Sequence, residues 1–100
     1  MNSLDDLKHA LRSFAEERNW FEYHTPKNLA MAVAGEAGEL AAEFQWLTAE
    51  ESANLTDKQR KAVESELADV LIYLVRLADE LEVDLLEVAY AKNETNKKRF

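Results

Sequence analysis

The chain of 100 residues contains no cysteine, one proline and two glycines. Without cysteine, neither a disulfide nor a thiolate metal site can form, which suits a reducing compartment. With so few turn-forming residues, long helices are favoured over many short strands. The length allows one domain and not two. We therefore expect a single all-α domain over residues 1–100.

Targeting signals and basic surfaces are also lacking. The N-terminal segment has neither the basic nor the apolar region of a signal peptide, and no run of 18 uncharged apolar residues predicts a membrane span. We therefore expect a cytoplasmic protein that does not bind membranes. The net charge of −8 argues against binding a nucleic-acid polymer. An acidic chain would need a metal ion or a local basic cluster to hold phosphate groups.

Hydrophobic periodicity and capping signals predict four helices. Each begins after a good N-cap, and the four caps are Ser3, Thr25, Thr56 and Asp84. The predicted ranges are 4–20, 26–47, 57–81 and 85–97, and the segment 48–55 has room for one further turn. Short connections favour antiparallel neighbours in a bundle. We therefore expect a four-helix bundle.

The third predicted helix is apolar nearly all round in its second half. The stretch LADVLIYLVRLA, from Leu67 to Ala78, has only Asp69 and Arg76 as charged residues. Such a helix must be buried on several sides, which one small bundle can hardly achieve. We therefore expect a second copy to complete the bundle, as a homodimer or as a tetramer built from two dimers.

Carboxylates stand where a core is expected. Glu36 and Glu39 are three residues apart in the apolar second helix, and Glu66 and Asp69 have the same spacing in the third. If these two helices face each other, four carboxylates converge. The alternative is an ordinary acidic pair on a solvated helix face, but burying an unpaired carboxylate at Asp69 would be costly.

Cations that could neutralise these acids are scarce. No Lys or Arg occurs between Lys27 and Lys58. A divalent ion would relieve the repulsion, and ligands made only of oxygen favour Mg²⁺ or Mn²⁺. Gly35 and Gly38 flank Glu36, which permits close approach of a ligand or of another helix. Tight helix packing alone would explain the two glycines equally well.

Three segments carry a family resemblance: GEAGELAAEFQW, ELADVLIYL and KNETN. Together they resemble the MazG-like all-α nucleoside triphosphate pyrophosphatases, and in particular the branch that acts on dCTP. The resemblance extends over almost the whole chain. The family's EExxE motif appears here with Gly35 in place of its first Glu, and its ExxD motif is Glu66 to Asp69.

The resemblance implies an oxygen-ligated Mg²⁺ site and a nucleotide site beside it. It implies metal ligands at Glu36, Glu39, Glu66 and Asp69. It also implies a base pocket of Trp20, Trp46 and Tyr73 with His24 nearby, and phosphate or sugar contacts from Lys92 and Asn96. In the dCTP branch a base-recognising His lies nine residues before the first Trp. Leu11 stands at that position here, which leaves the preferred base open.

The residues considered alone allow other interpretations of the nucleotide site. Trp20 and Trp46 lie near predicted helix ends, where large aromatics often close a core. His24, two residues before Pro26, fits an ordinary loop histidine. The basic cluster near Lys92 would also complement the dipole at a helix C-terminus.

These observations predict a Mg²⁺-dependent hydrolase that converts a deoxynucleoside triphosphate, dCTP or a related or modified one, to its monophosphate and pyrophosphate. The expected role is nucleotide-pool housekeeping. The four carboxylates would act catalytically, with Glu39 as the candidate to accept a proton from water. The alternative is a non-catalytic helical module that mediates oligomerisation or binds a nucleotide for regulation.

Overall fold

The computed structural model describes residues 3–100 and confirms the all-α prediction, because no strand occurs within that range. One short helix forms in the segment where a single further turn was expected. The helices are α1 (Leu4–Glu17), α2 (Pro26–Ala42), α3 (Ala49–Ser52), α4 (Asp57–Glu80) and α5 (Leu85–Arg99).

The predicted N-caps all form. Thr56 and Gln59 make a complete capping box at the start of α4: the Thr56 hydroxyl accepts from the Gln59 N–H at 3.1 Å, and the Gln59 carbonyl accepts from the Thr56 N–H at 2.9 Å. Ser3, Thr25 and Asp84 each accept from the N–H three residues further on. Local sequence thus determined where the long helices begin.

The predicted end of α1 was wrong by three residues. Asn19 adopts a left-handed conformation with φ of 56°, and the Trp20 N–H donates to the Ala15 carbonyl at 2.9 Å. This hydrogen bond is typical of a helix C-terminus, so α1 ends here and the chain leaves the helix axis. Trp20 therefore lies in a loop. The same closure ends α4, with Glu82 at φ of 56°.

The predicted end of α2 was also too late. After Ala42 the chain continues in tight turns, in which Phe44 donates to Ala41 and Leu47 donates to Phe44. Bonds of this spacing wind more tightly than an α-helix. Trp46 therefore lies in a turn outside α2. The predicted ends of α4 and α5 differ from the observed ones by one or two residues.

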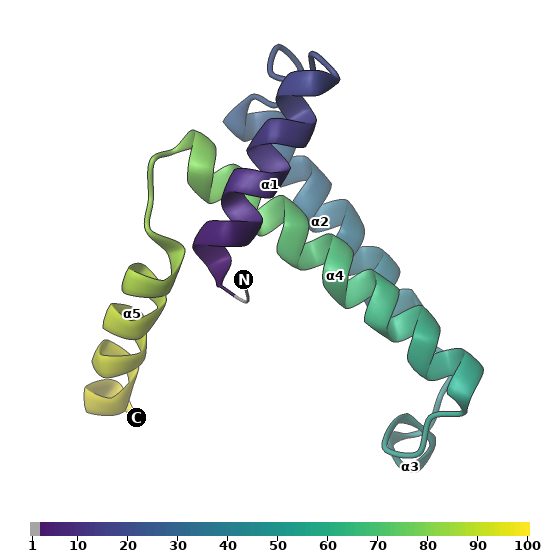
Figure 1. Cartoon of the computed structure of the whole chain (residues 1–100). Coiled ribbons are helices and arrows are strands. Elements are labelled where there is room, and N and C mark those ends of the chain that lie inside the picture. The colour runs from purple at the N-terminus through teal and green to yellow at the C-terminus, as the bar shows by residue number, and fades with distance from the viewer. Residues whose placement is uncertain (1–2) are drawn as a thin grey trace.

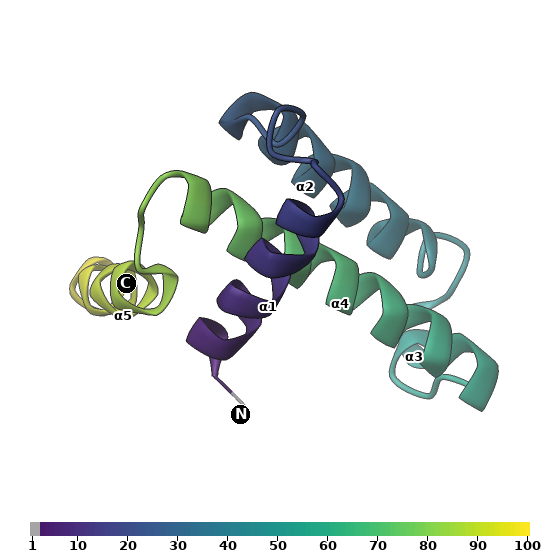
Figure 2. The ribbon, with the colours of Figure 1, turned by 45° about the horizontal axis from the view of Figure 1, so that its top comes forward.

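The two long helices α2 and α4 lie side by side and run antiparallel, and α1 crosses the C-terminal half of α4 (Figures 1 and 2). Helix α5 turns away after α4 and stands apart from α2 in both views. A single chain therefore does not close the predicted four-helix bundle. As a result, many apolar side chains of α4 and α5 remain exposed in one chain.

The core of one chain is small. Its buried apolar residues come from α1, α2 and α4: Ala15, Leu29, Val63, Val75 and Ala78. The accessible surface is 7816 Å², about 2,000 Å² more than the roughly 5,800 Å² expected for a compact monomer of this mass. None of the helices within residues 3–100 has the length and apolar character needed to cross a membrane.

Candidate functional site

Three glutamates from two helices meet on the α2–α4 pair. Glu36 and Glu39 come from successive turns of α2, and Glu66 comes from α4. One carboxylate oxygen from each lies within 4.8 Å of the others. The antiparallel packing of the two helices creates this convergence, which includes three of the four carboxylates expected from the sequence; Asp69 is not in the group. Three carboxylates at this separation form a set of hard oxygen ligands suited to a divalent cation.

The buried oxygens of this cluster lack partners. Glu36 Oε2 and Glu66 Oε2 are both inaccessible to water, and neither has a hydrogen-bond partner among the described residues. A buried acceptor without a partner is costly, and more so when it is charged. A cation held by these carboxylates would offset that cost. The arrangement therefore fits a metal better than it fits a solvated acidic face.

The electrostatics of the cluster point the same way. Loss of water raises the pKa of both Glu36 and Glu66 above its ordinary value, and the negative charge of Glu39 raises both further. Asp69, half-buried one turn after Glu66, adds to both shifts. No ion pair within residues 3–100 involves any of these four acids.

Two of the predicted base-pocket residues lie together in the α1–α2 loop. The Trp20 ring lies 5.8 Å from the His24 ring and packs edge-on against Phe14 at 5.2 Å. Trp20 is 39% exposed and His24 is half-buried. Tyr73 is half-buried on α4, one turn beyond Asp69 on the same side of the helix.

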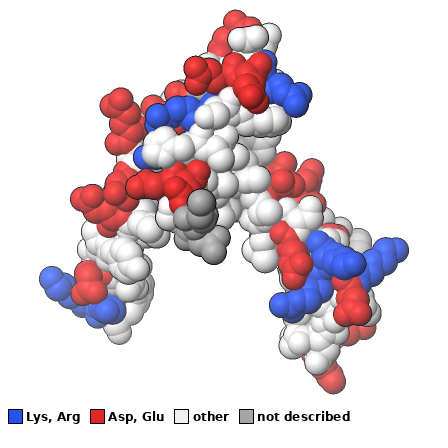
Figure 3. Space-filling view, viewed as in Figure 1, with Lys and Arg blue, Asp and Glu red and all other residues white. Residues whose placement is uncertain are grey.

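Other predicted contacts are not brought to the cluster by the same chain. Trp46 is 86% exposed in the turns that follow α2. Lys92 and Asn96 lie on α5, which stands away from α2 in Figures 1 and 2. Lys and Arg side chains gather at the free end of α5 and at the N-terminal end of α4, as Figure 3 shows. One copy therefore presents the acids without these contacts.

The two glycines face open space. A Cβ atom built at Gly35 or Gly38 would meet nothing within 4 Å. Tight helix packing inside one chain therefore does not explain the two glycines. Close approach of a ligand or of a second copy is the explanation that remains. The surface of α2 around Glu36 remains free for a ligand or a second copy.

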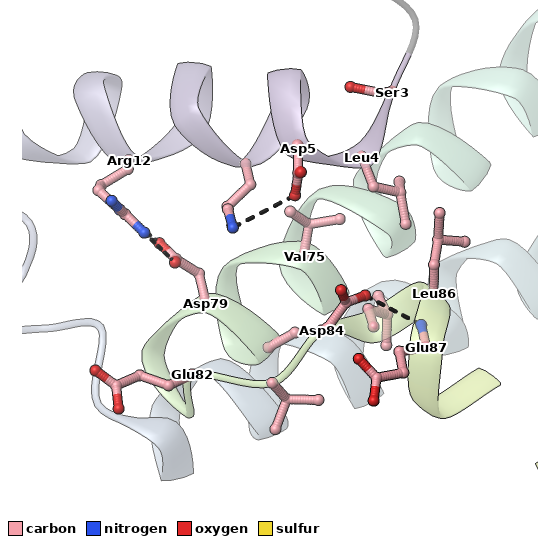
Figure 4. A pocket seen from close by; sticks show the side chains of 14 residues that line it. Ser3, Leu4, Asp5, Arg12, Val75, Asp79, Glu82, Asp84, Leu86 and Glu87 are labelled. Carbon is pink, nitrogen blue, oxygen red and sulfur yellow. Dashed lines mark hydrogen bonds and ion pairs between the residues drawn. The ribbon is translucent and has the colours of Figure 1, made fainter. Parts of the chain in front are cut away.

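A groove of about 650 Å³ lies elsewhere, between the start of α1, the end of α4 and the start of α5 (Figure 4). Its charged side chains are mostly acidic: Asp5, Asp79, Glu82, Asp84 and Glu87, against Lys8 and Arg12. None of the clustered glutamates lines it. The cluster of Glu36, Glu39 and Glu66 therefore lies outside this groove.

Sequence reasoning missed the role of Arg76. Its side chain is buried at 2% exposure and hydrogen-bonds both to the loop that carries Trp20 and to the C-terminal turn of α4. The available signal was the one that singled out Asp69, namely a lone charge in the most apolar stretch of the chain.

Antiparallel helices with acidic residues from an xExxE and an ExxD motif define an all-α protein with a carboxylate cluster that could bind a metal ion. The model of the MazG-like family matches residues 32–99, and the chain belongs to that family.

The chain is also similar to individual curated proteins and to solved structures. It is 42% identical over 100 residues to dCTP pyrophosphatase 1 of Bos taurus and 42% identical to that of Homo sapiens, with 98% of this chain covered. It spans 59% of the length of each. A solved pyrophosphatase from Archaeoglobus fulgidus is 39% identical, with a TM-score of 0.90 over 96% of this chain and 90% of that one.

Proposed function

We propose that this chain is a Mg²⁺-dependent nucleoside triphosphate pyrophosphohydrolase. It would convert a deoxynucleoside triphosphate, dCTP or a related one, to the monophosphate and pyrophosphate, in nucleotide-pool housekeeping. The carrying observation is the convergence of Glu36, Glu39 and Glu66 with two buried oxygens that have no partner. The names of the curated relatives and of the archaeal structure support the same reaction class.

The metal would be held by Glu36, Glu39 and Glu66, with Asp69 beside them as a fourth ligand. Hard carboxylate oxygens favour Mg²⁺, with Mn²⁺ as a substitute. When bound, such an ion supplies charge neutralisation for the phosphate oxygens and favours the deprotonated form of water.

Glu39 is the best placed of the three glutamates to accept a proton. It is exposed, whereas Glu36 and Glu66 are half-buried. In the proposed reaction the oxygen of water bonds to the α-phosphorus while its proton passes to the Glu39 carboxylate. The bond between the α-phosphorus and the bridging oxygen breaks, and pyrophosphate leaves with the electron pair.

The base would bind against the aromatic residues Trp20, Tyr73 and Trp46, with His24 as a polar contact. Trp20 and His24 already lie together, and both have exposed surface for a ligand. Leu11 cannot offer a hydrogen bond to a base. We therefore leave the base preference to experiment.

A second copy would complete this site. The excess surface of about 2,000 Å² is comparable to what one partner buries in an obligate dimer. The surface of α2 at Gly35 and Gly38 is open within one chain, which leaves room there for a second copy. In a dimer, or a tetramer of two dimers, α5 of one copy would supply Lys92 and Asn96 to the acids of another.

The proposal is tested by measuring pyrophosphate release from a panel of common and modified nucleoside triphosphates, with Mg²⁺, Mn²⁺ or a chelator. We expect release from at least one deoxynucleotide, abolished by the chelator. Glu39→Gln should lower kcat at least about 100-fold. Glu64→Gln is the matched control, because Glu64 is an exposed acid on α4 that pairs with Arg60. Nucleotide binding without any release would favour the regulatory module instead.

A further inference from the structure

Arg76 is a buried cation, and each of its three guanidinium nitrogens donates one hydrogen bond to a neighbouring side chain. Its Nη1 donates to Asp79 Oδ2 at 3.1 Å, and its Nη2 donates to Glu80 Oε1 at 2.8 Å. Its Nε donates to Nδ1 of His24 at 3.3 Å. Two of these bonds lie within α4, and the third reaches the α1–α2 loop. A buried guanidinium with three partners has little freedom to move.

The contact to His24 determines which ring nitrogen carries the proton. A guanidinium only donates hydrogen bonds, so Nδ1 of His24 must accept. A neutral imidazole that accepts at Nδ1 carries its hydrogen on Nε2. Burial and the positive charge of Arg76 lower the pKa of His24, while Glu80 opposes the shift. The ring is therefore neutral at neutral pH and has one N–H donor left, at Nε2.

Arg76 contacts the α1–α2 loop at two residues, His24 and Phe21. Its guanidinium lies over the Phe21 ring, 5.4 Å from the centroid. The loop between Phe21 and His24 is tight, because the N–H groups of Tyr23 and His24 both donate to the Trp20 carbonyl, at 2.8 and 3.0 Å. Holding Phe21 and His24 therefore also holds Trp20, whose ring lies 5.8 Å from His24.

The network extends to a third helix. Asp79 accepts from Arg76 and also from Arg12 of α1. Arg76 and Glu80 are the charged groups that act on His24, and Arg76 connects them to Asp79 and Arg12. Helices α1 and α4 together position the loop that connects α1 to α2.

We propose that Arg76 is a positioning residue that fixes His24 with its proton on Nε2, so that the loop presents a preset N–H donor beside Trp20 to an acceptor atom of the bound nucleotide. The contact between His24 and a nucleotide rests on the proposed function. The position of the hydrogen on the His24 ring does not depend on that function.

The first experiment is nitrogen NMR of the His24 ring in the wild-type protein without metal or nucleotide, assigned with the variant His24→Gln. We expect a single neutral form with hydrogen on Nε2 at pH 7.5. Arg76→Lys should give a mixture of the two neutral forms, because an ammonium lacks the fixed fork of donors. A wild-type ring that carries its hydrogen on Nδ1 would overturn the inference even if Arg76→Lys failed to fold.

The second experiment compares two replacements of His24 in a pyrophosphate-release assay. The amide nitrogen of Gln reaches the position of Nε2, whereas the amide of Asn reaches that of Nδ1. We expect KM for the best deoxynucleotide to be about fivefold higher in His24→Asn than in His24→Gln, since one hydrogen bond is worth about 1 kcal/mol. Equal KM values would overturn the nucleotide contact.

Arg76→Lys completes the test of positioning. We expect it to raise KM several-fold with kcat within about twofold of wild type, since a positioning residue acts on binding. An equal fall in kcat would overturn the assignment. If the wild-type protein releases no pyrophosphate from any nucleotide, the proposed function fails, while the NMR result still decides the state of His24.

Discussion

Nε of Arg12 lies 3.0 Å from Oδ2 of Asp79, and a second nitrogen of the same guanidinium bonds the other carboxylate oxygen (Figure 4). This bidentate pair joins α1 to the last turn of α4. Asp79 also accepts from the buried Arg76. One carboxylate thus accepts hydrogen bonds from two guanidinium groups that come from different helices.

Replacing Asp79 should therefore cost more than replacing an exposed acid of the same helix. We expect Asp79→Ala to lower the free energy of unfolding by on the order of 2 kcal/mol, because Arg76 keeps only Glu80 as an acidic partner. The measurement is urea unfolding followed by circular dichroism. Glu64→Ala is the control, since an exposed pair contributes little. Equal midpoints for the two variants would contradict the structural role of Asp79.

Asp79 should also make stability sensitive to acid. The hydrogen bond from Arg12 is the main cause that holds the pKa of Asp79 below its ordinary value. The folded state therefore binds fewer protons at this site than the unfolded state. The stabilisation is complete above the ordinary pKa of about 4 and is lost as the pH falls through the folded value. Urea midpoints of wild type and Asp79→Asn should differ at pH 7 and converge below pH 4.

Glu66 should make stability depend on pH in the opposite direction to Asp79. Its pKa is raised, first by loss of water and then by the charge of Glu39. The folded state binds more protons at this site, so its stabilising contribution exists at low pH and is lost as the pH rises through the raised value. In a chelator, Glu66→Gln should therefore melt above wild type at pH 7, and the gap should close near pH 4. A lower melting temperature than wild type at pH 7 would show that Glu66 has a partner.

Added Mg²⁺ should make the wild type more stable than Glu66→Gln, the reverse of the order expected in a chelator. Mg²⁺ at millimolar concentration should raise the melting temperature of the wild type by several degrees, because it binds the folded state selectively. Glu66→Gln should lose that response, whereas Glu64→Gln should keep it. The measurement is thermal unfolding with Mg²⁺ against a chelator. An identical rise in both variants would place the metal elsewhere.

Gly38 offers a test of the expected second copy. Because nothing in the chain lies within 4 Å of a Cβ at this position, Gly38→Leu should not disturb the fold of one chain. If another copy packs on α2 here, the larger side chain should dissociate it. We expect a smaller mass by light scattering with unchanged helical circular dichroism. Gly38→Ala is the matched small change, and a wild-type protein that is already monomeric would refute the expected assembly.

The sequence by itself determined the helical class, the starts of the helices and the pairs of acids that lie three residues apart on α2 and on α4. These features depend on local signals, since a cap bonds residues three apart and a helix repeats every 3.6 residues. The motif resemblance added the family, which the comparison confirmed. The ends of α1 and α2 were harder to predict, because a left-handed Asn19 and a run of tight turns leave weak traces in composition.

Tertiary structure alone decided the rest. The bond between Arg76 and His24 joins residues 52 positions apart, and the bond between Arg12 and Asp79 joins residues 67 apart. No local pattern encodes such pairs, since they depend on how whole helices pack. The same holds for α5, whose sequence predicted a helix but not its separation from α2. Helix packing also buries the Glu36 and Glu66 oxygens without partners and raises the pKa values of both groups. These properties identify the acidic residues as a candidate metal site.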